Sequence, residues 1–136
     1  MDFNTLLGKT LIEVTGAVGD DVMVFKCTDG SSYQLHHYTD CCESVSIEDI
    51  HGDLTDIVGA EILLAEESTS DSDPEGYVSE EGSYRDSYTW TFYRLTTIKG
   101  SVVIRWLGES NGYYSESVDF DEIKDGVIRS SYYEYD

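Results

Sequence analysis

The chain has 136 residues, of which 28 are acidic and eight are basic, for a formal net charge of −20. Its length fits one domain with a core of its own, and its charge disfavours binding to nucleic-acid backbones or anionic membranes. No apolar run approaches the roughly 20 residues that span a bilayer, and residues 1–4 lack the basic start of a secretory signal. We therefore expect one cytoplasmic domain, residues 1–136.

Short β-rich runs separated by Gly, Asp and Ser dominate the chain, and a helical period is not sustained anywhere. The predicted strands lie near residues 9–15, 21–28, 31–38, 42–49, 60–68, 88–98, 101–108 and 113–121. Asp29-Gly30 is a strong hairpin signal and Lys99-Gly100 a weaker one. Short helical turns are predicted at Asn4–Leu7 and Leu54–Val58. The predicted fold class is therefore all-β and mainly antiparallel.

Two segments differ from the rest of the chain. Residues 68–87 are rich in Ser, Asp, Glu and Gly and contain the one proline, Pro74. This composition predicts an acidic loop between two halves of the domain, either a solvated insertion or a recognition arm. The tail, residues 125–136, carries three tyrosines among acidic residues and is expected to be either an adhesive strand or disordered.

Two sequence signatures recur in the same order. Residues 6–12 resemble residues 57–63, and residues 43–50 resemble residues 116–123. Such an internal repeat predicts two β-meander halves that pack about a pseudo-twofold axis into a small barrel or sandwich. Chance similarity is the alternative. The predicted halves are about residues 4–52 and 55–124.

Each predicted half has a glutamate among apolar residues. Strand alternation places Glu43 and Glu116 on the inner face at the same position of the repeat. A buried carboxylate is costly unless it has a partner. A three-residue turn after Tyr38 would pair His37 with Glu43, while Arg105 and the tyrosine hydroxyls are candidate partners for Glu116.

These residues support two interpretations. One is a polar pocket at the end of the barrel that holds a cation or a small polar ligand. The other is that each glutamate anchors nearby backbone amides. The loop at residues 108–114 could also present rings to a ligand or partner. The candidate binding residues are His37, Glu43, Arg105, Asn111, Tyr113, Tyr114 and Glu116.

No catalytic residue is predicted, because no nucleophile or oxyanion hole accompanies the glutamates. The adjacent pairs His36-His37 and Cys41-Cys42 can each offer one ligand to a site, since neighbouring side chains on a strand point to opposite faces. A closed metal site usually needs four ligands, so we expect no metal and no other cofactor. The three cysteines are expected to be reduced thiols.

Four stretches of the sequence resemble a small uncharacterised domain family that occurs mainly in bacteriophages and prophages. These are residues 40–45 (DCCESV), 88–93 (YTWTFY), 104–106 (IRW) and 110–118 (SNGYYSESV). The likeness covers about residues 10–123. It implies a phage origin, and it transfers neither an activity nor a catalytic residue to this chain.

Three functions are compatible with these observations. The first is a non-enzymatic modulator, for example an inhibitor of host defence, that binds a host protein with a basic surface through its own acidic surface. The second is a protein that sequesters a small polar ligand, a nucleotide-like signal or a cation, between the two repeats. The third is a metal-assisted hydrolase that uses the glutamates. The oligomeric state is left open, a homodimer included.

Overall fold

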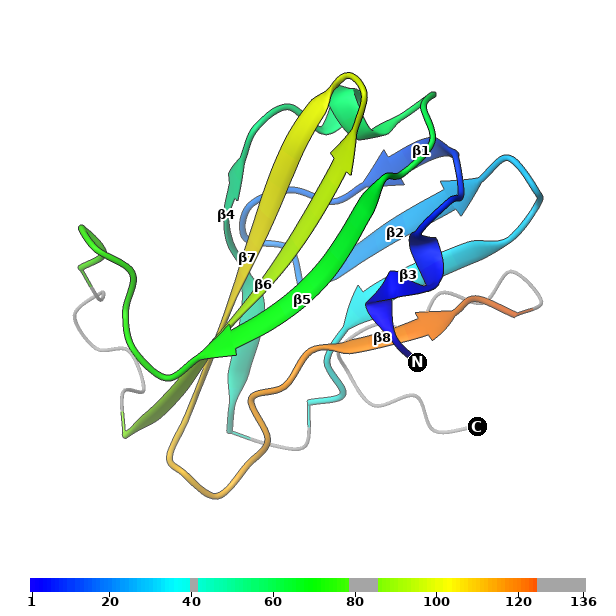
Figure 1. Cartoon of the computed structure of the whole chain (residues 1–136). Coiled ribbons are helices and arrows are strands. Elements are labelled where there is room, and N and C mark those ends of the chain that lie inside the picture. Colours follow the sequence, from blue (N-terminus) through cyan, green and yellow to red (C-terminus); the bar gives the residue numbers. More distant parts are fainter. Residues whose placement is uncertain (40–41, 79–85, 125–136) are drawn as a thin grey trace.

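The computed structural model describes residues 1–39, 42–78 and 86–124. Two four-stranded antiparallel sheets face each other, with strand orders β1-β2-β3-β8 and β4-β7-β6-β5 (Figure 1). Their strands are β1 (Leu11–Thr15), β2 (Val22–Cys27), β3 (Ser32–His36), β4 (Ser44–His51), β5 (Leu64–Ser70), β6 (Ser87–Thr97), β7 (Gly100–Ser110) and β8 (Asp119–Glu122). Two 3-10 helices, η1 (Phe3–Leu6) and η2 (Leu54–Ile57), precede β1 and β5. The fold is a sandwich, which confirms the predicted all-β class.

All eight predicted strands and both helical turns are present, with shifted boundaries. The largest shift is in the last strand, which begins at Asp119 because that is where pairing with His36 of β3 begins. The acidic loop is shorter than predicted, since β5 continues to Ser70. The middle of this loop, residues 79–85, and the predicted tail, residues 125–136, lie outside the described residues.

Each predicted half contributes three strands to one sheet and its fourth strand to the other. Strands β1, β2 and β3 form one sheet with β8, while β5, β6 and β7 form the second sheet with β4. The predicted hairpin between the third and fourth strands is therefore wrong. The chain instead crosses from one sheet to the other after β3, and again after β7. We call these two segments the first crossing (residues 37–43) and the second crossing (residues 111–118).

Backbone hydrogen bonds between the two halves have twofold symmetry. The amide of Gly8 donates to the carbonyl of Ile62 at 2.9 Å, and the amide of Gly59 donates to the carbonyl of Leu11 at 2.8 Å. In the repeat alignment Gly8 corresponds to Gly59 and Leu11 to Ile62, so the two bonds are equivalent. A bridge between the equivalent residues Thr10 and Glu61 lies between them. This is the symmetry that a duplication requires, and the duplication itself stays a prediction.

The core lies between the inner faces of the sheets. Phe3 and Leu6 of η1 extend it at the side of β5, where Figure 1 shows this helix beside the sandwich. Trp106 belongs to this core, whereas Trp90 lies on the outer face of its sheet. There the indole of Trp90 donates to Asp73 at 3.0 Å, so the beginning of the acidic loop packs onto the sheet. Within the described residues, no helix has the length and apolar character needed to cross a bilayer.

Candidate functional site

The first crossing is held by a buried histidine–glutamate pair. His37 Nε2 lies 3.0 Å from Glu43 Oε2, and the two side chains are 3% and 0% exposed. The Nδ1 atom of His37 lies 2.6 Å from the carbonyl oxygen of Ser117. A carbonyl only accepts hydrogen bonds, so Nδ1 carries a hydrogen. The predicted contact between His37 and Glu43 is confirmed, although it connects the two ends of a crossing rather than two strands of a hairpin.

The second crossing is held by Glu116 in a comparable way. Its Oε2 atom accepts a hydrogen bond of 2.5 Å from the Ser110 hydroxyl, and its Oε1 atom accepts one of 2.8 Å from Thr89 of β6. Glu116 is 9% exposed. The predicted partners, Arg105 and the tyrosine hydroxyls, are therefore wrong for this carboxylate. Hydroxyl groups of the neighbouring strands take their place.

The two glutamates are equivalent in the repeat, and so are their first partners. His37 precedes Glu43 by six residues, and Ser110 precedes Glu116 by six residues. Each glutamate thus links the later part of its crossing to the chain at the end of the preceding strand, which is β3 for Glu43 and β7 for Glu116. The difference lies in the chemistry: the partner is an imidazole, which can carry a positive charge, in the first half and a neutral hydroxyl in the second.

Glu116 lies at a cavity of about 230 Å³, which we call the hydroxyl cavity. It is lined by Glu67, Thr69, Thr89, Thr91, Ser115, Glu116, Ser117 and Val118. Thr91 and Glu116 are buried, while Glu67, Thr69 and the two serines are exposed. The lining of the cavity therefore combines one buried carboxylate, one exposed carboxylate and several hydroxyls. His37 and Glu43 are not part of its lining.

A glycine allows the second crossing to approach β7. A Cβ atom added at Gly108 would lie 2.8 Å from the Cβ atom of Glu116, closer than real Cβ contacts occur. Gly108 does not have the positive φ of a turn glycine, so close approach is the reason for glycine at this position. This contact fixes the height of Glu116 above β7 and hence the shape of the hydroxyl cavity.

Arg105 lies on the outer face of its sheet, away from both glutamates. Its Nε atom donates to Asp49 Oδ1 at 2.5 Å, a second bond joins it to Asp49 Oδ2, and its guanidinium lies 5.7 Å from the centre of the Trp90 ring. The bonds to Asp49 raise the pKa of Arg105 above its ordinary value. The outward direction of Arg105 could have been predicted, because Arg105 alternates with the buried Ile104 and Trp106, whereas its pairing with Asp49 depends on the register of β4 and β7.

The remaining predicted residues form the surface of the second crossing. Asn111 Oδ1 accepts a hydrogen bond of 3.0 Å from the amide of Tyr113, and Tyr113 is 84% exposed. The rings of Tyr113 and Tyr114 meet edge to face with their centres 5.0 Å apart. The loop therefore presents one open aromatic ring, and its predicted role in recognition remains a prediction.

A second histidine–carboxylate pair was not anticipated from the sequence. His36 Nε2 contacts Asp121 of β8, and His36 is fully buried with its Nδ1 atom lacking a hydrogen-bond partner within the described residues. The pair depends on the neighbouring positions of β3 and β8, which are distant in sequence. Local patterns carry no signal for such a contact.

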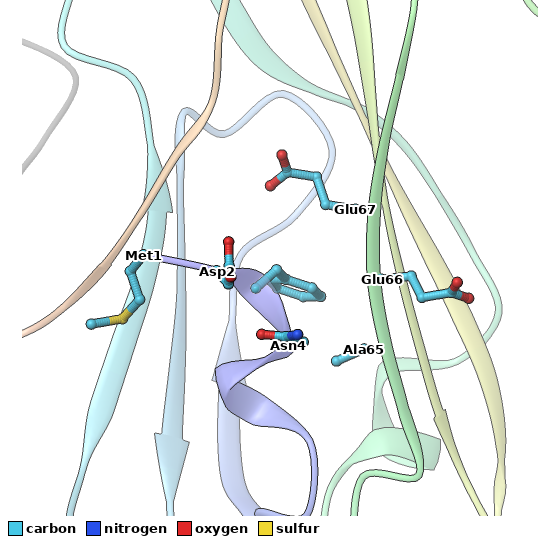
Figure 2. A pocket seen from close by; sticks show the side chains of 7 residues that line it. Met1, Asp2, Asn4, Ala65, Glu66 and Glu67 are labelled. Atoms are coloured by element: carbon cyan, nitrogen blue, oxygen red, sulfur yellow. The ribbon is translucent and has the colours of Figure 1, made fainter.

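A further hollow of about 400 Å³ lies between η1 and β5 and is lined by Met1, Asp2, Phe3, Asn4, Ala65, Glu66 and Glu67. Figure 2 shows the carboxylate of Glu67 directed toward η1 and Asp2, whereas Glu66 points away on the other side of β5. Tyr93 of β6 pairs with Glu67 in the ladder, and its buried hydroxyl has no hydrogen-bond partner in the described chain. Burial, and then the negative charge of Glu67, raise the pKa of Tyr93 far above its ordinary value. We call this hollow the η1–β5 hollow.

The described residues contain no group of three or more His, Cys, Asp or Glu side chains positioned to hold a metal ion. Cys27 is free and buried, and burial raises the pKa of its thiol. Cys42 is disulfide-bonded, in contrast to the reduced thiol expected from the sequence.

Comparison with known proteins gives one match. The family described as a domain of unknown function, DUF7448, matches residues 4–120. This range includes both crossings and the hydroxyl cavity, and the chain belongs to this family. No curated protein and no solved structure matches the chain.

Proposed function

We propose that this member of the DUF7448 family is a non-catalytic binding protein whose acidic surface engages a basic partner protein. The observation that carries the proposal is the η1–β5 hollow, where Asp2 and Glu67 lie on opposite sides and the lining contains no lysine or arginine. The lining holds three carboxylates, those of Asp2, Glu66 and Glu67, against one α-amino group, that of Met1. This excess of negative charge attracts a positively charged surface and speeds association.

The basic side chains of the described residues do little to cancel this charge. Four of them are engaged within the chain: Lys9 with Asp29, Lys26 with Glu13, Lys99 with two carbonyl oxygens at η2, and Arg105 with Asp49. With 28 acidic against eight basic residues in the whole chain, most acidic side chains have no cation to pair with. The surplus is therefore available to a partner.

The buried pair of His37 and Glu43 does not favour catalysis. A histidine–carboxylate pair acts as a general base only where it reaches a proton of the substrate. His37 and Glu43 are 3% and 0% exposed, and both ring nitrogens of His37 are occupied within the chain. These groups hold the first crossing in place. The resemblance to phage and prophage domains favours a host protein as the partner.

Affinity capture from a bacterial lysate tests this proposal. The wild-type protein is compared with Asp2→Asn/Glu67→Gln, which removes two of the three carboxylates that line the hollow, and with Asp71→Asn/Glu75→Gln, which removes the same charge from the exposed loop. Captures are quantified by mass spectrometry in about 0.1 M and about 1 M salt, between which the Debye length falls from about 10 Å to about 3 Å.

We expect one or more proteins to be captured by the wild type and by the loop variant in low salt only. The hollow variant should lose them. Equal capture by both variants would show that the hollow is not the binding surface. Capture that persists in high salt would show that charge does not drive the association.

The hydroxyl cavity favours a second candidate function, the binding of a small ligand. Its volume of about 230 Å³ is below the roughly 300–1,000 Å³ of pockets that enclose drug-sized ligands. A nucleotide-like signal is therefore less well matched to it than a smaller molecule.

A further inference from the structure

The two repeats treat their buried glutamates differently: the first places an imidazole beside its carboxylate, and the second places neutral hydroxyls there. Glu43 has an imidazole within hydrogen-bond distance. Glu116 has only the hydroxyls of Ser110 and Thr89, and no lysine, arginine or histidine of the described residues contacts it. A carboxylate that is about nine-tenths buried is costly when its charge is unmatched.

The space beside Glu116 is suited to admit a cation from outside. The exposed Glu67 and the buried Glu116 and Thr91 all line the hydroxyl cavity. Thr69, Thr89 and the two serines of the second crossing add hydroxyl groups to the same lining. Six positions before the glutamate, the first repeat has His37, whereas the second repeat has Ser110. An incoming positively charged donor would therefore take, beside Glu116, the place that the imidazole of His37 takes beside Glu43.

We propose that the hydroxyl cavity binds a primary ammonium group, as carried by small aliphatic amines of the polyamine class. An ammonium group has three N–H donors and no acceptor, and the lining offers two carboxylates and several hydroxyl oxygens. Charge-assisted bonds from the ammonium to Glu116 and Glu67 are the stronger kind of hydrogen bond. The net charge of −20 further concentrates cations near the protein.

Other ligand classes fit this cavity less well. Phosphate-bearing ligands would be repelled by the two carboxylates. A transition metal prefers imidazole or thiolate ligands, and a calcium ion takes six to eight oxygen ligands at short distance. Within the described part of the chain, no cluster of three acidic, histidine or cysteine side chains could hold a metal ion.

Titration with putrescine, followed by calorimetry and by amide NMR, tests the proposal. Binding should shift the amide signals of Thr89, Thr91 and Ser115–Ser117. Butanediol of the same chain length, which replaces the ammonium groups with hydroxyls, should bind at least about tenfold more weakly because it lacks charge-assisted bonds.

Three single variants remove the same charge at different places. Glu116→Gln and Glu67→Gln should each weaken putrescine binding by about tenfold, the loss expected for one charge-assisted hydrogen bond. Glu66→Gln is the matched control, since Glu66 neighbours Glu67 but does not line the cavity. Its putrescine affinity should stay within about twofold of the wild type. Glu67 is exposed, so Glu67→Gln keeps the test valid even if Glu116→Gln does not fold.

Four results would overturn the assignment: no binding of putrescine by the wild type, equal binding of butanediol, equal losses in all three variants, or displacement of putrescine by calcium chloride at equal ionic strength.

Nα-acetyl-lysine amide distinguishes the source of the ammonium group. Tighter binding of this probe than of putrescine assigns the cavity to a lysine side chain of another protein, and the reverse assigns it to a free amine. Glu67 lines both the hydroxyl cavity and the η1–β5 hollow, so the two proposals are told apart by Glu116→Gln, which changes the cavity alone, and by Asp2→Asn, which changes the hollow alone.

Discussion

Removal of Glu43 from the first crossing should destabilise the protein strongly. Glu43→Leu leaves His37 Nε2 without its acceptor in a place where the two side chains are 0% and 3% exposed. Breaking a buried pair by removing one partner costs about 3–5 kcal/mol. A protein of 136 residues has a free energy of unfolding of roughly 7–20 kcal/mol, at about 0.05–0.15 kcal/mol per residue. The variant should therefore lose a large share of its stability.

Urea unfolding, followed by the fluorescence of the buried Trp90 and Trp106, measures this loss. Glu66→Leu is the control, because a substitution at an exposed position usually changes stability by less than about 0.5 kcal/mol. The double variant His37→Leu/Glu43→Leu removes both polar groups, so its cost should be smaller than the sum of the two single costs. A cost below about 1 kcal/mol for Glu43→Leu would refute the view that this pair holds the crossing.

Three further predictions concern other parts of the structure. Gly108→Ala should lower the free energy of unfolding in urea by about 1–3 kcal/mol, because the added Cβ would collide with Glu116. An unchanged urea midpoint would show that the second crossing moves to accommodate the added Cβ. Tyr93→Phe should match or exceed wild-type stability at neutral pH, where the buried hydroxyl has no partner within the described residues. The pKa of Tyr93 is raised in the folded state, so the wild-type protein loses stability as the pH rises above the unfolded-state pKa of about 10. The free energy of unfolding of Tyr93→Phe should then exceed that of the wild type by up to about 1.4 kcal/mol more for each pH unit. A difference that stays constant above pH 10 would contradict this prediction. Cys27 should react with a thiol reagent only after unfolding, because it is buried and its thiol pKa is raised; peptide mass spectrometry identifies the labelled residue, and labelling of the native protein would contradict its burial.

The strands and turns were predictable because they depend on local sequence. Alternating apolar residues defined the strands, and the dipeptides Asp29-Gly30 and Lys99-Gly100 correctly marked two of the connections between them. At Gly30 the φ angle of +89° explains the preference for glycine. The repeat stays a prediction, which rests on the apolar pattern that the corresponding segments of the two halves share.

The crossings were not predictable from these patterns. An alternating strand after a short connection looks the same whether it pairs with its predecessor or joins the opposite sheet. The contact between His37 and Glu43 was predicted from a hairpin register that the structure does not have. The prediction was still correct, because a hairpin and a crossing both bring the two ends of this seven-residue segment together. Thr89 was missed as a partner of Glu116 because it belongs to a strand that is distant in sequence. Ser110 could have been found, because it precedes Glu116 by six residues as His37 precedes Glu43.

The hydroxyl cavity could not be predicted from the sequence for a similar reason. Threonine and serine are common in strands and loops, so Thr69, Thr91 and Ser115 gave no signal on their own. Glu67 was placed at the boundary of the acidic loop, whereas β5 continues beyond it. Only the crossing of residues 111–118 over the inner face of β5 and β6 brings these groups into one cavity.

Hydrogen–deuterium exchange of the protein, free and bound to a partner obtained by affinity capture, tests the proposed function most directly. If the acidic surface at the η1–β5 hollow is the binding site, exchange should slow in the peptides that contain Asp2 and Glu67. Peptides from the hairpin at Lys99 should exchange at the same rate in both states. Protection confined to that hairpin or to the loop at Tyr113, with the hollow unchanged, would contradict the account.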